Sequence, residues 1–160
     1  GVLFVRGSAQ KKVWPPMVTH DWEKEGHRGA RKFDNLGQRD DGRLEALGTA
    51  VEFYNSLGGA RVEARIRTHV TQLLNGLKPL SDRLHFLTPS QPDLQGGFVI
   101  FLYKGKNAKA TAETLYRDFG ISAATADVGG QTWVRFSPHI YNTPEEIEIA
   151  IKAVHHLVSA

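Results

Sequence analysis

The chain has 160 residues, 41% hydrophobic and 23% charged, which is the balance of a globular protein with one domain, or one domain and part of another. Its 20 Lys and Arg residues exceed its 17 Asp and Glu residues only enough for a net charge of +3, so the charge does not favour nucleic acid as a partner. The absence of cysteine excludes disulfides and thiolate catalysis and fits a cytoplasmic protein, and no apolar run has the roughly 20 residues that span a membrane.

The first third of the chain predicts a strand, a long loop and a helix. Residues 1–5 are continuously apolar, which predicts a buried strand. Residues 7–42 carry many glycines, prolines and charges without periodicity, which predicts a long loop. From Arg43 to Leu57 a helix is expected, capped by Asp40 or Asp41 and ended by the two glycines that follow. Its inward face is predicted to be Leu44, Leu47, Val51, Tyr54 and Leu57.

The remaining sequence alternates helices and strands. Helices are predicted from about residue 61 to Pro79, from Asn107 to Phe119, and after Thr143; strands are predicted at 84–87, 98–103, 121–125 and 132–136. The charged residues of the first of these helices are expected on its solvated face, and they are Arg61, Glu63, Arg65 and Arg67. Three or four strands with helices on one side make an α+β layer.

The most informative stretch is WVRFSPHIYNTPEEI, from Trp133 to Ile147. Thr143 can cap the last helix, Pro144 suits its first position, and Glu146 completes a capping box. Arg135 should therefore lie near the end of a strand, held by structure on both sides. A guanidinium fixed in this way is a planar fork for a carboxylate or a phosphate. The alternative is a surface arginine on an edge strand.

The pattern R-x-S-x-x-x-Y-N-T-x-E-E-I resembles the C-terminal signature of class V aminotransferases, fold-type-I enzymes that use pyridoxal 5'-phosphate. It is formed by Arg135, Ser137, Tyr141, Asn142, Thr143, Glu145, Glu146 and Ile147. In addition, residues 1–6 resemble the strand that follows the cofactor-binding lysine, and residues 37–40 resemble the G-T-x-[ND] turn. The resemblance implies an α/β fold. Residues 1–60 would be the C-terminal part of the large cofactor-binding domain, and residues 61–160 the small α+β domain.

The resemblance also implies roles for individual residues. Arg135 would bind the α-carboxylate of an amino-acid substrate. Gln38, which stands where the family commonly has Thr, and Arg39 would contact the cofactor phosphate across a homodimer interface; a plain polar turn is the alternative for Gln38. The Schiff-base lysine would precede this chain, so we expect no catalytic residue in this segment. No His, Cys or Asp spacing predicts a metal site.

The predicted function is that of a fragment of a pyridoxal-phosphate enzyme that acts on an amino acid through an external aldimine. The segment Ala126–Gln131 lacks the cysteine that desulfurases carry, which argues against a Cys-dependent desulfurase. The turn at residues 37–40 resembles the isopenicillin-N-epimerase-like branch, but racemisation, transamination and elimination remain open. The alternative is a non-catalytic α+β module that binds a carboxylate ligand or a partner through Arg135. A weaker alternative is a nucleic-acid binder that uses Lys104, Lys106 and Lys109.

Overall fold

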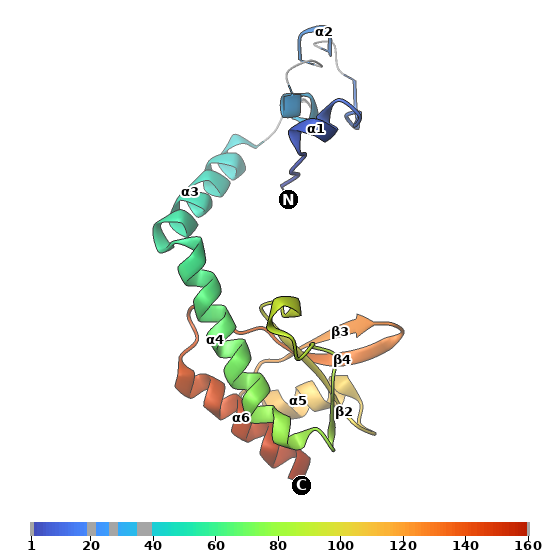
Figure 1. Cartoon of the computed structure of the whole chain (residues 1–160), viewed down its shortest axis with the longest axis vertical. Helices are drawn as coiled ribbons and strands as arrows, with labels where there is room; N and C mark the ends of the chain where they lie inside the picture. Colours follow the sequence, from blue (N-terminus) through green and yellow to red (C-terminus); the bar gives the residue numbers. More distant parts are fainter. Residues whose placement is uncertain (1, 19–21, 26–28, 35–39, 160) are drawn as a thin grey trace. The chain divides into compact units, whose positions relative to one another are not determined.

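The computed structural model describes residues 2–18, 22–25, 29–34 and 40–159, which form two compact units (Figure 1). Unit 1 is Gly1–Glu52 and unit 2 is Phe53–Ala160. The division falls inside a continuous helix, α3 (Asp41–Leu57). No helix in the described ranges has the length and apolar character needed to cross a membrane.

Unit 1 contains short helical segments in place of the predicted strand and long loop. They are α1 (Gly7–Gln10), α2 (Trp22–Glu25) and the 3-10 helix η1 (Gly29–Phe33). The predicted buried strand at residues 1–5 is wrong, because Val2, Leu3 and Phe4 are 72–85% exposed and no described segment of this unit pairs with them. An extended segment becomes a strand only when a neighbour accepts and donates its backbone hydrogen bonds.

Helix α3 forms as predicted, but its apolar stripe is not buried. Leu44, Leu47, Val51 and Tyr54 follow the expected helical spacing and remain 42–51% exposed, and no residue of the helix is buried. The helix ends at Gly58, whose φ of +83° is a left-handed value that favours glycine. The apolar spacing therefore predicted the helix correctly, but the burial of its apolar face was not confirmed.

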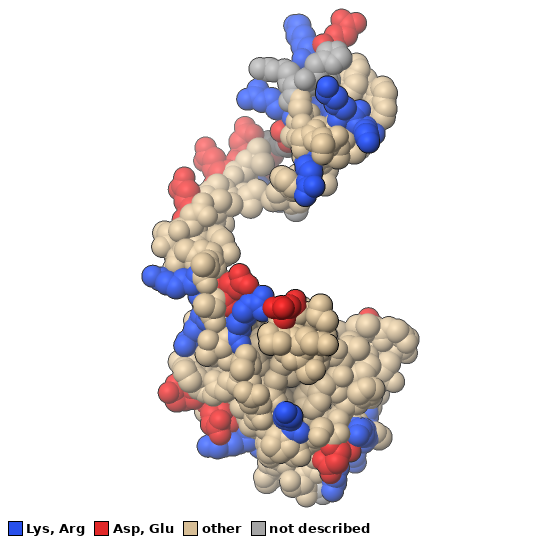
Figure 2. Space-filling view, viewed as in Figure 1, with Lys and Arg blue, Asp and Glu red and all other residues tan. Residues whose placement is uncertain are grey.

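Unit 2 is a four-stranded antiparallel sheet with three helices on one face (Figure 1). The helices are α4 (Gly59–Leu77), α5 (Ala108–Phe119) and α6 (Pro144–Ser159). The strands are β1 (Leu84–Phe86), β2 (Val99–Tyr103), β3 (Ala124–Val128) and β4 (Gln131–Phe136), in the order β1-β2-β4-β3. Two 3-10 turns, η2 (Lys78–Leu80) and η3 (Pro92–Leu94), lie in the connections. Figure 2 shows acidic and basic side chains interspersed over the visible face of this unit.

Strand β3 begins three residues later than the sequence predicted, for a local reason. Gly120 ends α5 with a φ of +68°, and its N–H donates to the carbonyl of Tyr116. The N–H of Ile121 then reaches back to the carbonyl of Leu115, which is a Schellman ending. Ile121 is therefore used to close the helix and is not free to start the strand.

The core of unit 2 lies between the sheet and the helices. Cross-strand neighbours Val99 and Phe136, and Phe101 and Val134, point into it. The four residues predicted for the inner face of α6, namely Ile147, Ile151, Val154 and Val158, are all buried there. Helices α4 and α6 pack so closely at Gly76 that a Cβ added there would lie 2.5 Å from Cδ1 of Ile151.

Candidate functional site

Arg135 lies on β4, an internal strand, so the alternative of an arginine on an edge strand is wrong. Because Val134 and Phe136 point into the core, the alternation of a strand places Arg135 on the opposite face. The residue is half-buried, and its Nε is buried without a hydrogen-bond partner among the described residues. A buried donor left without an acceptor costs about 1–3 kcal/mol. The strand therefore holds Arg135 in place, and the Nε–H of its guanidinium has no acceptor among the described residues.

The surroundings of Arg135 on this face are apolar. Its partners in register are Ile100 on β2 and Ala124 on β3, so no carboxylate stands directly beside it across either strand. Trp133, two residues earlier, is only 7% exposed, and its Nε1 donates to the carbonyl of Val128 at 3.3 Å. An apolar setting strengthens the attraction between a guanidinium and an acidic ligand group.

The turn that follows β4, residues 137–143, is fixed by hydrogen bonds on both sides. The backbone N–H of His139 donates to Oδ1 of Asn142 at 2.9 Å, and the Asn142 N–H donates back to the His139 carbonyl at 3.1 Å. The guanidinium of Arg65 on α4 donates to the Asn142 carbonyl at 3.0 Å. The expectation that Arg65 lies on a solvated face is therefore wrong, because it is half-buried under this turn.

The predicted capping box at the start of α6 is present. The N–H of Glu146 donates to Oγ1 of Thr143 at 3.2 Å, and the N–H of Thr143 donates to Oε2 of Glu146 at 3.0 Å. The same carboxylate oxygen accepts from Nδ2 of Asn142 at 3.1 Å. These hydrogen bonds, that from the Thr143 backbone first, lower the pKa of Glu146 below its ordinary 4.5.

His69 is a buried polar residue that sequence reasoning missed. Its side chain is fully buried in α4, and neither ring nitrogen has a hydrogen-bond partner in the described part of the chain. Burial, with a further contribution from the charge of Arg65, lowers the pKa of His69; the Asn142 backbone and the Glu146 carboxylate oppose the shift. Its position between Ile66 and Leu73 on the apolar stripe of α4 was the only sequence signal.

A cavity of about 440 Å³ lies behind the same turn, on the helix-covered side. Four signature residues line it, namely Ser137, Asn142, Glu146 and Ile147, together with apolar residues such as Leu73 and Phe136. Arg135 does not line this cavity. The signature residues that line the cavity therefore lie close together, around the turn and the start of α6. The Arg135 guanidinium does not join them, because it and the cavity lie on opposite faces of the sheet.

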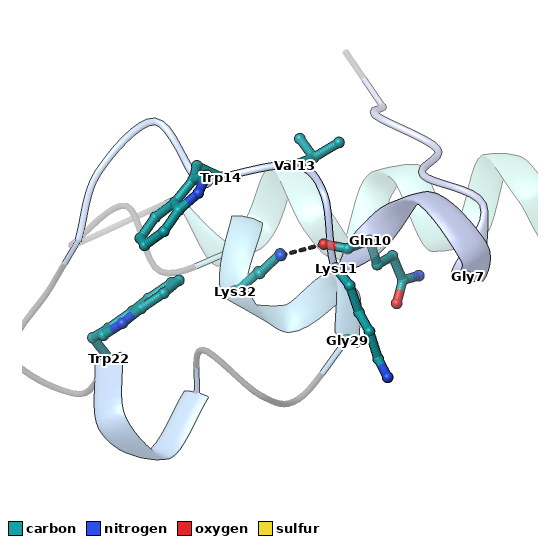
Figure 3. A pocket seen from close by; sticks show the side chains of 8 residues that line it. All are labelled: Gly7, Gln10, Lys11, Val13, Trp14, Trp22, Gly29 and Lys32. Atoms are coloured by element: carbon teal, nitrogen blue, oxygen red, sulfur yellow. Dashed lines mark hydrogen bonds between the residues drawn. The ribbon is translucent and has the colours of Figure 1, made fainter.

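Unit 1 has its own cavity, of about 620 Å³ (Figure 3). The rings of Trp14 and Trp22 stack over it with centroids 5.4 Å apart, and Nζ of Lys32 donates to the carbonyl of Gln10. Gln38 and Arg39, the predicted phosphate contacts, lie outside the described residues. No group of three or more His, Asp or Glu side chains that could hold a metal ion occurs within the described ranges.

Comparison with known proteins supports the resemblance carried by the signature. No protein-family model matches the chain. The chain is 33% identical to an isopenicillin N epimerase from Streptomyces clavuligerus over 123 residues, which is 75% of this chain and 30% of that protein. It is 28% identical to an isopenicillin N epimerase from Amycolatopsis lactamdurans over 159 residues, which is 89% of this chain and 39% of that protein. The chain thus spans well under half the length of these curated relatives.

Solved structures agree on the fold. A cysteine desulfurase from Thermococcus onnurineus NA1 matches 98% of this chain, and 42% of that chain, with a TM-score of 0.80 at 22% identity. The cysteine desulfurase CsdA from Escherichia coli matches 82% of this chain, and 33% of that chain, with a TM-score of 0.67 at 16% identity. The predicted resemblance to class V aminotransferases and the α/β fold class are therefore confirmed.

Proposed function

We propose that this chain is the C-terminal part of a pyridoxal-phosphate-dependent enzyme of the class V aminotransferase type, and that Arg135 binds the carboxylate of an amino-acid substrate. The observation that carries the proposal is the half-buried Arg135 guanidinium, whose Nε is buried and unpartnered among the described residues. The relatives are named for epimerisation, so we rank epimerisation ahead of transamination and elimination. The absence of cysteine from these 160 residues argues against a Cys-dependent desulfurase reaction.

The role of Arg135 follows from the chemistry of its side chain. A guanidinium presents two parallel N–H donors to the two oxygens of a carboxylate, which fixes the orientation of the bound molecule as well as its position. The strand at Arg135 is internal and hydrogen-bonded on both sides, and the turn beyond it is held by Arg65 and by the capping box. The substrate carboxylate would therefore bind to a preorganised donor.

The cofactor, when bound, supplies the electron sink that this class of chemistry needs. The residues proposed to contact its phosphate, Gln38 and Arg39, lie outside the described part of the chain. We propose that these contacts are made across the interface of a cytoplasmic homodimer.

We further propose that unit 1 is the edge of a larger domain. Val2, Leu3 and Phe4 are exposed, and the α3 stripe of Leu44, Leu47, Val51 and Tyr54 is uncovered. Burying a side chain of this size contributes about 1.5–3 kcal/mol, so this much exposed apolar surface favours a partner. The relatives contain more than twice the length of this chain, and the additional polypeptide in a full-length protein would supply that cover.

The experiment uses the longest polypeptide encoded with this segment, purified with cofactor. Substrate binding across a panel of amino acids is measured from changes in cofactor absorbance, and product stereochemistry is measured by chiral chromatography. Arg135→Ala should weaken binding roughly 30-fold or more, because truncating one member of a desolvated charge pair costs about 2–5 kcal/mol. Arg117→Ala, which removes an exposed arginine paired with Asp118, is the control. Unchanged affinity in a folded Arg135→Ala protein would refute the proposal.

A non-catalytic binding module is the second candidate, and one observation favours it. Unit 2 has a continuous core of its own that includes residues from all three helices and from the sheet. A protein that takes up no cofactor, yet binds carboxylates in a manner that depends on Arg135, would support this candidate in place of the enzyme.

A further inference from the structure

A separate cavity of about 330 Å³ lies in unit 2 beside the C-terminal half of α4. Its other walls are β1, the start of η2 and the connection between β1 and β2, residues 87–98, which is drawn in yellow-green in Figure 1. Neither Arg135 nor any residue of the signature lines it. The function proposed above therefore makes no use of this cavity.

The wall formed by residues 87–98 is held in place by hydrogen bonds at several points. Arg67 of α4 donates to the carbonyl of Pro92 at 3.1 Å, and Nε2 of Gln95 donates to the carbonyl of Pro89 at 3.0 Å. The N–H of Ile100 donates to Oγ1 of Thr88 at 2.7 Å. A connection anchored to a helix, to itself and to a strand keeps its shape without a ligand, so the cavity is preformed.

The lining of this cavity includes several exposed polar side chains that bind no other described residue. Five polar side chains make no hydrogen bond or ion pair with any described residue, namely Thr71, Asn75, Lys78, Ser81 and Ser90. No Asp or Glu is among the described residues that line the cavity; Asp93 is in the adjoining turn but is not part of the wall. Half-buried Leu74 and Phe86 add an apolar surface.

We propose that this cavity binds a small organic anion, with its acidic group on the Lys78 ammonium and the neighbouring hydroxyls, and with an apolar or planar body against Leu74 and Phe86. A single ammonium among hydroxyl and amide donors, without a competing carboxylate, recognises a negative charge. The volume is at the lower end of the range for small-molecule sites, which favours a ligand of about one ring. A carboxylate and a phosphate ester share this chemistry.

The test is a titration of the full chain, labelled with ¹⁵N, followed by two-dimensional NMR. The probes are phenyl phosphate, benzoate, inorganic phosphate and benzyl alcohol. We expect saturable shifts at the amides of residues 71–95 with one or both organic anions and much weaker effects with benzyl alcohol. The tighter of the two anions identifies the acidic group. Lys78→Gln should weaken binding roughly tenfold or more, because it removes the charge.

The matched control is Lys109→Gln, which removes an exposed lysine of α5 that does not line the cavity. Lys78 is exposed, so its substitution should leave the fold intact, and the unperturbed part of the spectrum checks this. Equal affinities of the two variants would overturn the proposal, as would the absence of saturable shifts up to about 10 mM of every probe. Equal binding of inorganic phosphate and phenyl phosphate would also overturn it, because the apolar surface would then contribute nothing.

Discussion

Replacing Thr143 with alanine should destabilise unit 2 through the loss of one hydrogen bond at the start of α6. Oγ1 of Thr143 accepts from the N–H of Glu146, which has no carbonyl partner in the first turn of the helix. Removing a threonine cap costs about 1 kcal/mol, with a range of roughly 0.5–2 kcal/mol. In a domain of roughly this size, about 1 kcal/mol lowers the melting temperature by about 4–8 °C.

Urea unfolding followed by far-UV circular dichroism measures this change, with an unchanged m-value as the sign that the two-state comparison holds. Thr143→Ser keeps the hydroxyl and should recover most of the stability. Because Glu146 accepts from the Thr143 N–H in return, Thr143→Ala and Glu146→Gln should be non-additive in a double-mutant cycle.

The pH dependence provides an independent check of the same box. The native pKa of Glu146 is lowered, so its contribution is complete above the ordinary value of 4.5 and is lost as the pH falls through the native value. The difference between the wild type and Glu146→Gln should therefore shrink in acid. A serine variant as unstable as the alanine variant, or an alanine variant as stable as the wild type, would refute the reasoning.

Two other substitutions test the packing of α4. Gly76→Val should cost about 1–3 kcal/mol in urea unfolding, because its Cβ would meet three side-chain carbons of Ile151 within 2.9 Å, whereas Gly48→Val, with nothing within 4 Å, should be nearly neutral. Equal effects of the two valines would contradict the close approach of α4 and α6. The native pKa of His69 is lowered, so its unfolded form binds more protons and stability should fall as the pH drops below about 6.5. His69→Leu should flatten this part of the stability curve, measured as urea midpoints between about pH 5 and 7, and an unchanged slope would rule out His69 as its source.

The parts of the fold that the sequence predicts well are those determined by near neighbours in the chain. The Asn107 cap, the Thr143 capping box and the apolar stripe of α6 each depend on residues within a few turns, and all are present. The location of Arg135 near the end of a strand was predicted for the same reason, since a β-type run leads directly into a capped helix.

The missed features depend on contacts between distant residues. Arg65 and Asn142 are 77 positions apart. The sequence around Arg65 therefore did not predict that its guanidinium would donate to the Asn142 carbonyl. His69 is fully buried, and the Asn142 backbone and the Glu146 carboxylate act on its pKa from more than 70 positions along the chain. Two other predictions were wrong for a different reason, namely the buried strand at residues 1–5 and the buried face of α3. Their apolar patterns are typical of buried segments, but no described segment of this chain covers them.

The side-by-side arrangement of α4 and α6 has a consequence for dissecting unit 2. The Gly76 carbonyl meets Nε2 of His155 at 2.8 Å, and Arg65 binds the turn just before α6, so the opening and closing helices of the unit are linked directly. Cleavage at the exposed Gly129–Gly130 hairpin would therefore leave two pieces, one with α4 and one with α6. The pieces would associate through the contact between these two helices and through the pairing of β4 with β2 and β3. The same hairpin is a suitable place to open the chain for a circular permutant.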